Sequence, residues 1–188
     1  MPTKPGSGPR STHRSELARH DAPMRDEVHS RERTSEEIIA LVVAYAESLD
    51  AGDLDGVAAL FEHGTFRSAR GGEPLVGRIA VRRQYEPVLL YDDGTPRTKH
   101  VLGNIEVVVD DVIDGNARTA TSHCTFTVLQ QTPGTDLRAI LAGRYHDRFE
   151  QGPDGWRFVE RVVHPDLLGD LSRHMGPRDI GAQKLGRR

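Results

Sequence analysis

The sequence predicts an α+β domain in which three N-terminal helices pack on a curved, mainly antiparallel sheet. Two observations carry this prediction: helix-like segments occupy the first half of the domain, and four strand-like segments joined by turn signals follow them. Such an order is typical of a domain whose helices gather on one face of an antiparallel sheet. A strongly curved sheet with helices across its open side would form a cone-shaped roll with one closed end.

Three helices are expected first. Residues 34–37, Thr-Ser-Glu-Glu, form a capping box that predicts a helix start, and Gly52 marks the end of this helix. Asp53 can cap a second, short helix, and a third fits residues 79–86, up to Pro87. The apolar positions at helical spacing are Ile38, Leu41, Val42, Tyr45 and Leu49 in the first helix and Leu54, Val57, Leu60 and Phe61 in the second.

The strands come later, apart from a short one expected at residues 65–68. The four long strands are expected at residues 99–110, 117–131, 138–150 and 156–163. Glycine, proline, asparagine and aspartate mark the turns between them. The turn signals are Asp114-Gly115-Asn116, Thr132-Pro133-Gly134-Thr135 and Pro153-Asp154-Gly155.

The two ends of the chain differ in composition from the middle. Residues 1–33 contain almost no aliphatic side chains, which predicts a disordered N-terminal tail. Residues 171–188 are expected to form a C-terminal tail, so the folded domain spans residues 34–170. A domain of this size can bury a core without staples, and the single Cys124 cannot form an internal disulfide.

Composition excludes several classes of protein. The net charge of −3, from 25 basic and 28 acidic residues, indicates neither a nucleic-acid nor a membrane partner. No run approaches the roughly 18 apolar residues of a membrane helix, and the basic start lacks the apolar stretch of a secretory signal. With one cysteine, a reduced, cytoplasmic setting is expected. No nucleophile elbow, phosphate-binding loop or dinucleotide fingerprint occurs, and no cofactor is expected.

His100 is the most informative candidate for chemistry. It closes the polar run of residues 97–100 and opens an apolar strand-like run at Val101, which places a titratable side chain at the mouth of the sheet. Histidine changes charge near neutral pH and therefore suits general acid–base catalysis. The alternative is a surface histidine at a strand end.

Several short motifs between residues 35 and 165 point to one known family. They are residues 44–53, Leu60-Phe61, Gly77 before a helix, residues 97–100, residues 143–147 and residues 154–158. On these motifs the chain resembles the SnoaL-like branch of the nuclear transport factor 2-like superfamily, and within it scytalone dehydratase. The resemblance implies a cystatin-like fold and a homodimer or higher homo-oligomer that forms through the outer sheet face. That fold hosts dehydratases, isomerases, polyketide cyclases, epoxide hydrolases and non-catalytic modules.

The resemblance also implies two catalytic residues. His100 matches a pocket histidine that acts as general acid or base in the dehydratase. Asp50 matches a pocket aspartate, which would fix the tautomer of His100 and raise its basicity. An aspartate beside Ala51-Gly52 at a helix end is also a common turn former.

Two phenols of the dehydratase have no counterpart here. Leu49 and Phe66 stand where the dehydratase has tyrosines that hold the substrate. Tyr45 lies one turn before Leu49 and could donate a hydrogen bond instead, although a core tyrosine bonded to the backbone is an alternative. Tyr145, near a substrate-binding asparagine of the dehydratase, is a second replacement or a rim aromatic.

The expected pocket is mostly apolar. Its candidate walls are Leu49, Phe61, Phe66, Leu102, Phe126, Leu141 and Phe149. Such a pocket suits a polyketide-like, aromatic or other cyclic substrate. The expected activity is cofactor-independent proton transfer beside a carbonyl, in a dehydratase, isomerase or cyclase. The alternative is a non-catalytic ligand-binding or dimeric assembly module, in which His100 and Asp50 would not touch.

Two further histidines are expected away from this pocket. His123 and His146 should lie nearly opposite each other on adjacent strands, facing outward. His100 should lie roughly 13 Å further along the sheet, so no three-histidine metal site is expected. The arginines expected on the same outer face are Arg144, Arg148 and Arg161.

The alternation of inward and outward side chains along the strands predicts the location of the remaining candidate residues. Cys124 shares its face with apolar residues and is expected in the core. Epoxide hydrolysis would require an Asp–Arg–Asp constellation on the inner face, and the sequence places no arginine between Asp147 and Asp50.

Overall fold

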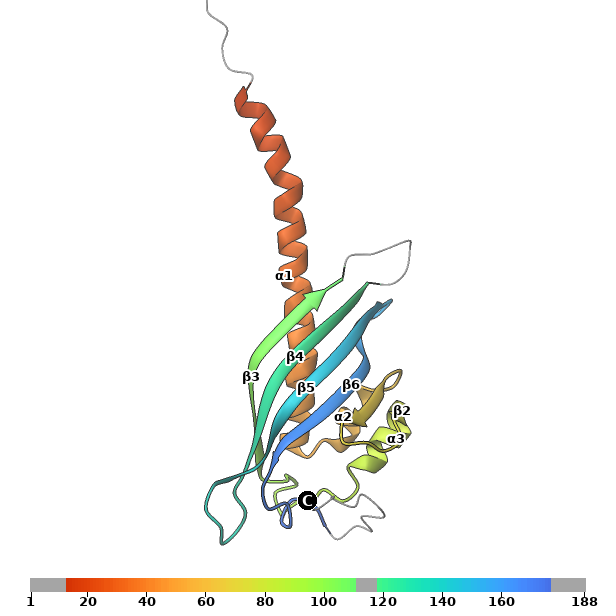
Figure 1. Ribbon diagram of the computed structural model, residues 1–188, viewed down its shortest axis with the longest axis vertical. Helices are drawn as coiled ribbons and strands as arrows, with labels where there is room; N and C mark the ends of the chain where they lie inside the picture. The colour runs from red at the N-terminus through yellow and green to blue at the C-terminus, as the bar shows by residue number, and fades with distance from the viewer. Residues whose placement is uncertain (1–12, 111–117, 177–188) are drawn as a thin grey trace, which may run out of the picture. The chain divides into compact units, whose positions relative to one another are not determined.

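The computed structural model describes residues 13–110 and 118–176, with side chains from residue 28 onward. The chain divides into two compact units, residues 1–34 and 35–188. Figure 1 shows the helices and strands of the described residues. In chain order they are α1 (His13–Ala51), α2 (Leu54–Ala59), β1 (Thr65–Ser68), β2 (Leu75–Val76), α3 (Gly77–Gln84), β3 (Thr98–Val109), β4 (Thr119–Gln130), β5 (Arg138–Gly152) and β6 (Gly155–Leu168).

The strands form one six-stranded sheet in the order β2-β1-β6-β5-β4-β3. β1 runs parallel to β6, and the other neighbours are antiparallel. This confirms an α+β domain with a mainly antiparallel sheet. α3 follows β1 and β2, so the helices do not all precede the first strand. β2, which has two residues, is too short to show a period and was not expected from the sequence.

The first helix begins earlier than its capping signal indicated. α1 starts at His13, and Thr34 lies inside it. The prediction of a helix start at Thr34 is therefore wrong. Helix formers such as glutamate and arginine dominate the preceding residues and carry the helix through the Ser/Thr site. The helix includes residues 13–33, for which the composition indicated no regular structure, and residues 1–12 lie outside the described part.

The sheet bends at β-bulges in its long strands. The register shifts at residues 103–106 of β3, at 128–129 of β4, and at 142–143 and 148–149 of β5. A bulge inserts an extra residue on one strand, which bends the strand and increases its twist. A side chain at Gly143 would lie 2.1 Å from the carbonyl oxygen of His164, so only glycine permits this approach. The turn expected at residues 114–116 lies outside the described residues.

The concave side of the sheet carries the core. Buried residues of α1, α2 and α3 form one cluster with inward side chains of β1 and β3–β6. Six aromatic rings of this cluster are at most 3% exposed: Tyr45, Phe61, Phe126, Tyr145, Phe149 and Phe158. Phe61 stacks on Phe158 with their centroids 5.0 Å apart. The packing of these helices on the sheet explains why the apolar positions at helical spacing identified the inward faces.

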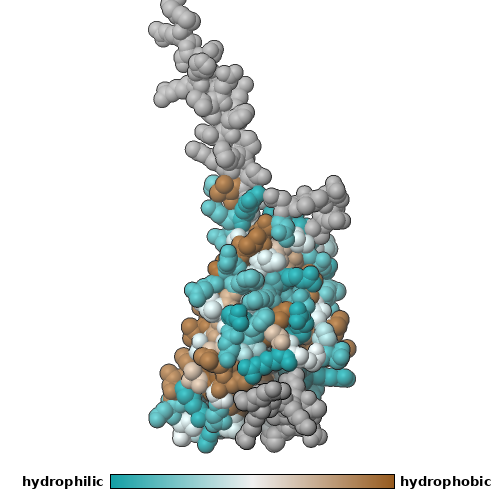
Figure 2. Space-filling model, viewed as in Figure 1, coloured by the Kyte–Doolittle hydropathy of each residue, from teal (hydrophilic) through white to brown (hydrophobic). Residues whose placement is uncertain are grey.

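The expectation that Arg161 lies on the outer face of the sheet is wrong. His123, Arg144 and Arg148 are exposed or partly exposed on the outer face as expected, where the surface over the long strands is mainly hydrophilic (Figure 2). Arg161, in contrast, is 0% exposed on the inner face. Arg161 of β6 lies opposite Asp147 of β5 in the strand register. The bulge at residues 148–149 of β5 shifts the alternation of inward and outward side chains by one residue. Counting alternate residues across the bulge therefore reverses the face.

The domain continues past the expected boundary at residue 170. Leu171 and Met175 pack against the core, and Met175 forms an isolated β-bridge with Val88. Residues 177–188 lie outside the described part. No helix within the described ranges is both long and apolar enough to span a membrane.

Candidate functional site

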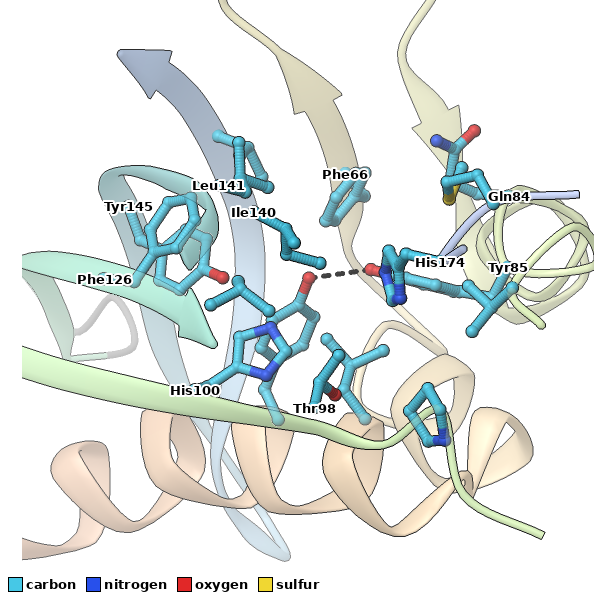
Figure 3. Close-up of a pocket in the computed structure, with 17 residues that line it drawn as sticks. Phe66, Gln84, Tyr85, Thr98, His100, Phe126, Ile140, Leu141, Tyr145 and His174 are labelled. Carbon is cyan, nitrogen blue, oxygen red and sulfur yellow. Dashed lines mark hydrogen bonds between the residues drawn. The ribbon is translucent and has the colours of Figure 1, made fainter. Parts of the chain in front are cut away.

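A cavity of about 140 Å³ lies on the inner face of the sheet, among α1, α3 and the long strands. Figure 3 shows the residues that line it. The polar or aromatic members are Tyr45, Phe66, Gln84, Tyr85, Thr98, His100, Phe126, Tyr145 and His174, and the apolar members are Leu49, Val88, Pro96, Val128, Ile140, Leu141, Val163 and Met175. Its volume is close to that of an engineered cavity of about 150 Å³ that binds benzene, so it fits one aromatic ring.

His100 and Asp50 are in direct contact. The Nδ1 atom of His100 lies 2.7 Å from Oδ1 of Asp50, and the two side chains are 6% and 7% exposed. Asp50 lies in the last turn of α1, and His100 lies near the start of the edge strand β3. The same carboxylate accepts hydrogen bonds from the His100 backbone N–H and the Thr98 hydroxyl, both at 2.8 Å. Asp50 thus ties the end of α1 to the edge of the sheet.

This geometry determines which nitrogen of His100 is available. Burial acts to raise the pKa of Asp50, but the hydrogen bonds from His100 and Thr98 hold it below its ordinary value. The carboxylate is therefore ionised at neutral pH and can only accept, so the Nδ1–H of His100 donates to it. With Nδ1 engaged in this way, Nε2 is the ring nitrogen that can accept a hydrogen bond or a proton in the cavity wall.

The lowered pKa of Asp50 predicts how stability depends on pH. A carboxylate with a lower pKa in the folded state stabilises the fold above its unfolded pKa of about 3.9. That contribution is lost as pH falls through the folded value. In urea unfolding from neutral pH down to about pH 3, Asp50→Asn should lower the free energy of unfolding most near neutrality, and its deficit should shrink in acid. The exposed Asp92→Asn is the control, and a deficit that is constant with pH would contradict the lowered pKa.

Three tyrosines of the cavity provide hydroxyl groups. The hydroxyls of Tyr45 and Tyr85 are 2.7 Å apart and hydrogen-bonded. The Tyr145 hydroxyl makes no hydrogen bond with any described residue. Burial raises the pKa of all three phenols, so each is protonated at neutral pH and can donate. The cavity therefore carries phenol groups, although Leu49 and Phe66 provide none.

A buried ion pair packs against the rings of two of these tyrosines, Tyr45 and Tyr145. Arg161 and Asp147 form a bidentate pair, and both side chains are 0% exposed. The guanidinium carbon lies 4.1 Å from the ring centroid of Tyr45, 4.2 Å from that of Tyr145 and 4.8 Å from that of Phe158. Its charge opposes the effect of burial on the phenol pKa values. Arg161 thus favours negative charge that develops on these phenol oxygens, and the carboxylate of Asp147 opposes part of this effect.

The structure brings most of the expected site residues together. Among the expected walls, four line the cavity: Leu49, Phe66, Phe126 and Leu141. Tyr45, Tyr145 and His100 also line it, and Asp50 reaches it through His100. Three expected walls do not line it: Phe61, Leu102 and Phe149. Phe61 and Phe149 pack against Phe158 in the core behind the cavity, with centroid distances of 5.0 and 4.7 Å.

Sequence reasoning missed four polar residues of the cavity: Gln84, Tyr85, Thr98 and His174. Tyr85 lies four residues after the buried Val81, and this helical spacing could have identified it. His174 lies in the segment that composition had indicated as a tail. The i, i+4 pair Leu171 and Met175 was the available signal that this segment packs.

The outer face holds a separate row of imidazoles. His123 stacks on His146 with a centroid distance of 4.3 Å, and His146 lies 4.2 Å from His164. His123 and His146 are direct partners across β4 and β5, as expected. The rings of His123 and His146 are stacked, and those of His146 and His164 are tilted by 39°. The described residues contain no group of three or more potential ligands arranged to hold a metal ion.

Cys124 lies in the core as expected. It is 3% exposed, and burial raises the pKa of its thiol to about 11. The thiol is therefore protonated at neutral pH, which is unfavourable for a nucleophile.

The fold and the cavity define a class of small α+β domains with a ligand-sized pocket between a curved sheet and its helices. The chain belongs to the SnoaL-like domain family, whose sequence pattern matches residues 31–162.

Solved structures share this fold. A protein of Novosphingobium aromaticivorans, described as NTF2-like with a cystatin-like fold, is 25% identical over 76% of this chain and 87% of its own (TM-score 0.56). A candidate scytalone dehydratase of the same species is 22% identical over 84% of this chain and 98% of its own (TM-score 0.57). ActVI-ORFA of Streptomyces coelicolor is 23% identical over 70% of this chain and 96% of its own (TM-score 0.53). These likenesses support an NTF2-like, cystatin-like fold.

Proposed function

We propose that this protein is a cofactor-independent enzyme that moves a proton at a carbon beside a carbonyl group of a small cyclic substrate. The observation that carries the proposal is the 2.7 Å contact between His100 Nδ1 and Asp50 Oδ1 in the wall of an apolar cavity. A carboxylate that orients an imidazole is a recurring arrangement for a general base. The solved structure of a candidate scytalone dehydratase with this fold is consistent with such chemistry.

Each polar group has a role in the proposed reaction. His100 Nε2 takes the proton from carbon, and Asp50 stabilises the imidazolium that forms. The Tyr145 hydroxyl donates a hydrogen bond to the oxygen on which negative charge develops, and the Tyr45–Tyr85 pair offers a second donor. Return of the proton from His100 to another atom of the substrate gives isomerisation. Its transfer from the His100 imidazolium to a departing hydroxyl, which leaves as water while the carbon–carbon double bond forms, gives dehydration. The cavity volume favours one substrate ring in the pocket, with the rest toward its mouth.

The contact between His100 and Asp50 weakens the alternative of a non-catalytic binding module, which predicted no contact between them. Epoxide hydrolysis gains an arginine on the inner face, since Arg161 pairs with Asp147. Both side chains are 0% exposed, however, and neither lines the cavity. This pair therefore cannot reach a substrate, and proton transfer by His100 is the better-supported reaction.

Hydrogen–deuterium exchange tests the proposal without knowledge of the natural substrate. In deuterium oxide, the protein should speed the loss of the proton signals beside the carbonyl of small cyclic ketones such as cyclohexenone, 4-chromanone and 1-tetralone. Proton NMR measures the rate for each ketone. No acceleration above buffer with any of the three ketones would contradict the proposed reaction.

A further inference from the structure

The C-terminal segment places a second histidine in the cavity. His174 lines the wall, and Figure 3 shows its ring among the side chains around the pocket. Its backbone is held firmly: the Leu89 N–H donates to the His174 carbonyl at 2.9 Å, and the Gly176 N–H donates to the Pro87 carbonyl at 2.8 Å. The Tyr91 hydroxyl also donates to the Arg173 carbonyl at 2.7 Å. The position of the ring is therefore set by the fold.

The imidazole of His174 has no structural task that explains its polarity. Nδ1 is buried without a hydrogen-bond partner, and the ring makes no hydrogen bond with any described side chain or backbone group. A buried polar atom that lacks a partner costs roughly 1–3 kcal/mol. An apolar residue would fill this place at lower cost, as Met175 does beside it. Its polar atoms therefore fit a role toward a ligand.

The charge state of His174 suits hydrogen bonding. Burial, followed by the nearby His100, lowers the pKa of His174 to about 4, and Asp50 opposes this shift. The ring is neutral at physiological pH and presents one donor and one acceptor nitrogen. A neutral imidazole can therefore bind a hydroxyl or carbonyl oxygen without placing a positive charge beside His100.

We propose that His174 is a substrate-binding residue that hydrogen-bonds an oxygen substituent on the substrate ring, separate from the group on which His100 acts. The substrate class is then a ring that carries a hydroxyl or carbonyl oxygen in addition to the reacting carbon. This inference deepens the proposed function and rests on it, because His174 can bind a substrate only if the protein is an enzyme. The hydrogen bond from His174 to a ligand can be tested by itself.

A matched pair of ligands provides the test. In mildly acidic buffer, where 4-nitrophenol is uncharged, 4-nitrophenol and 4-nitrotoluene differ only in a hydroxyl in place of a methyl group, and calorimetry measures the affinity of each. His174→Phe should reduce the preference for the phenol over the toluene by about five-fold, the value of one hydrogen bond. Ser172→Ala, at an exposed position of the same segment outside the cavity wall, should leave the preference unchanged. An equal preference in wild type and His174→Phe, or no binding of either ligand to wild type, would overturn the proposal.

A second measurement uses wild-type protein alone, so it still tests the proposal if the His174→Phe variant does not fold. In wild-type protein, 4-nitrophenol should shift the ring ¹⁵N resonances of His174 and 4-nitrotoluene should not; resonances that respond to neither ligand overturn the proposal. The outcome is separable from that of the exchange experiment. Binding that depends on His174 without ketone exchange would contradict only the catalytic function, whereas exchange with an unchanged ligand preference would contradict only the role of His174.

Discussion

Arg161→Met should lower the free energy of unfolding by about 3–5 kcal/mol, as expected when one partner of a buried ion pair is removed. The variant leaves the carboxylate of Asp147 without its partner in a site where both side chains are 0% exposed. It also removes a cation that lies within 5 Å of three aromatic ring centroids. Chemical denaturation followed by circular dichroism measures the change.

Two further variants show whether burial causes this effect. Arg144 forms a pair with Asp166 at 2.8 Å, close to the 2.6 Å of Arg161 and Asp147, but these side chains are 48% and 43% exposed. Arg144→Met should therefore change the free energy of unfolding by at most about 1 kcal/mol. The double variant Asp147→Leu/Arg161→Met removes both charges and should recover part of the loss. A loss below about 1 kcal/mol for Arg161→Met would mean that this pair does not stabilise the inner face.

His100→Gln should slow the ketone exchange by about 10²-fold or more, which is the usual contribution of a general base. Glutamine keeps a hydrogen-bonding group of similar length beside Asp50 but cannot accept a proton at neutral pH. The fold should survive, because the hydrogen bond from the His100 backbone N–H to Asp50 does not depend on the side chain. Proton NMR in deuterium oxide measures the rate for each protein.

His164→Gln is the matched control for this substitution. His164 lies in the row of imidazoles on the outer face, away from the cavity, so its variant should exchange ketones at the wild-type rate. An unchanged rate in a folded His100→Gln protein would exclude His100 as the base. Equal losses in both variants would point to a general effect on the protein rather than on the cavity.

The long strands and the inward face of α1 could be predicted because their signals are local and repeated. β1 falls at residues 65–68 as expected, and Asp53 caps α2 through the backbone N–H of Gly56 at 2.8 Å. The contact between Asp50 and His100 was expected only through family resemblance. Nothing in the spacing of 50 residues relates the two positions, since the path of the chain between them sets their distance.

The remaining errors have identifiable physical causes. The inward position of Arg161 depends on a bulge, and one extra residue reverses the face of every later side chain. Tyr85 and His174 enter the cavity through packing between distant segments. The bridge between Val88 and Met175 is such a contact. The spacings of Val81–Tyr85 and Leu171–Met175 could mark buried faces, but they do not say which distant segment each face packs against.

The tautomer of His100 tests the central claim most directly. ¹⁵N NMR of histidine-labelled protein at about pH 8, where an ordinary imidazole is neutral, distinguishes the protonated ring nitrogen from the bare one. The structure predicts a proton on Nδ1, held by Asp50, and a bare Nε2 in the cavity. In Asp50→Asn this preference should weaken. A wild-type ring with the proton on Nε2 would contradict the account, because no base would then face the substrate.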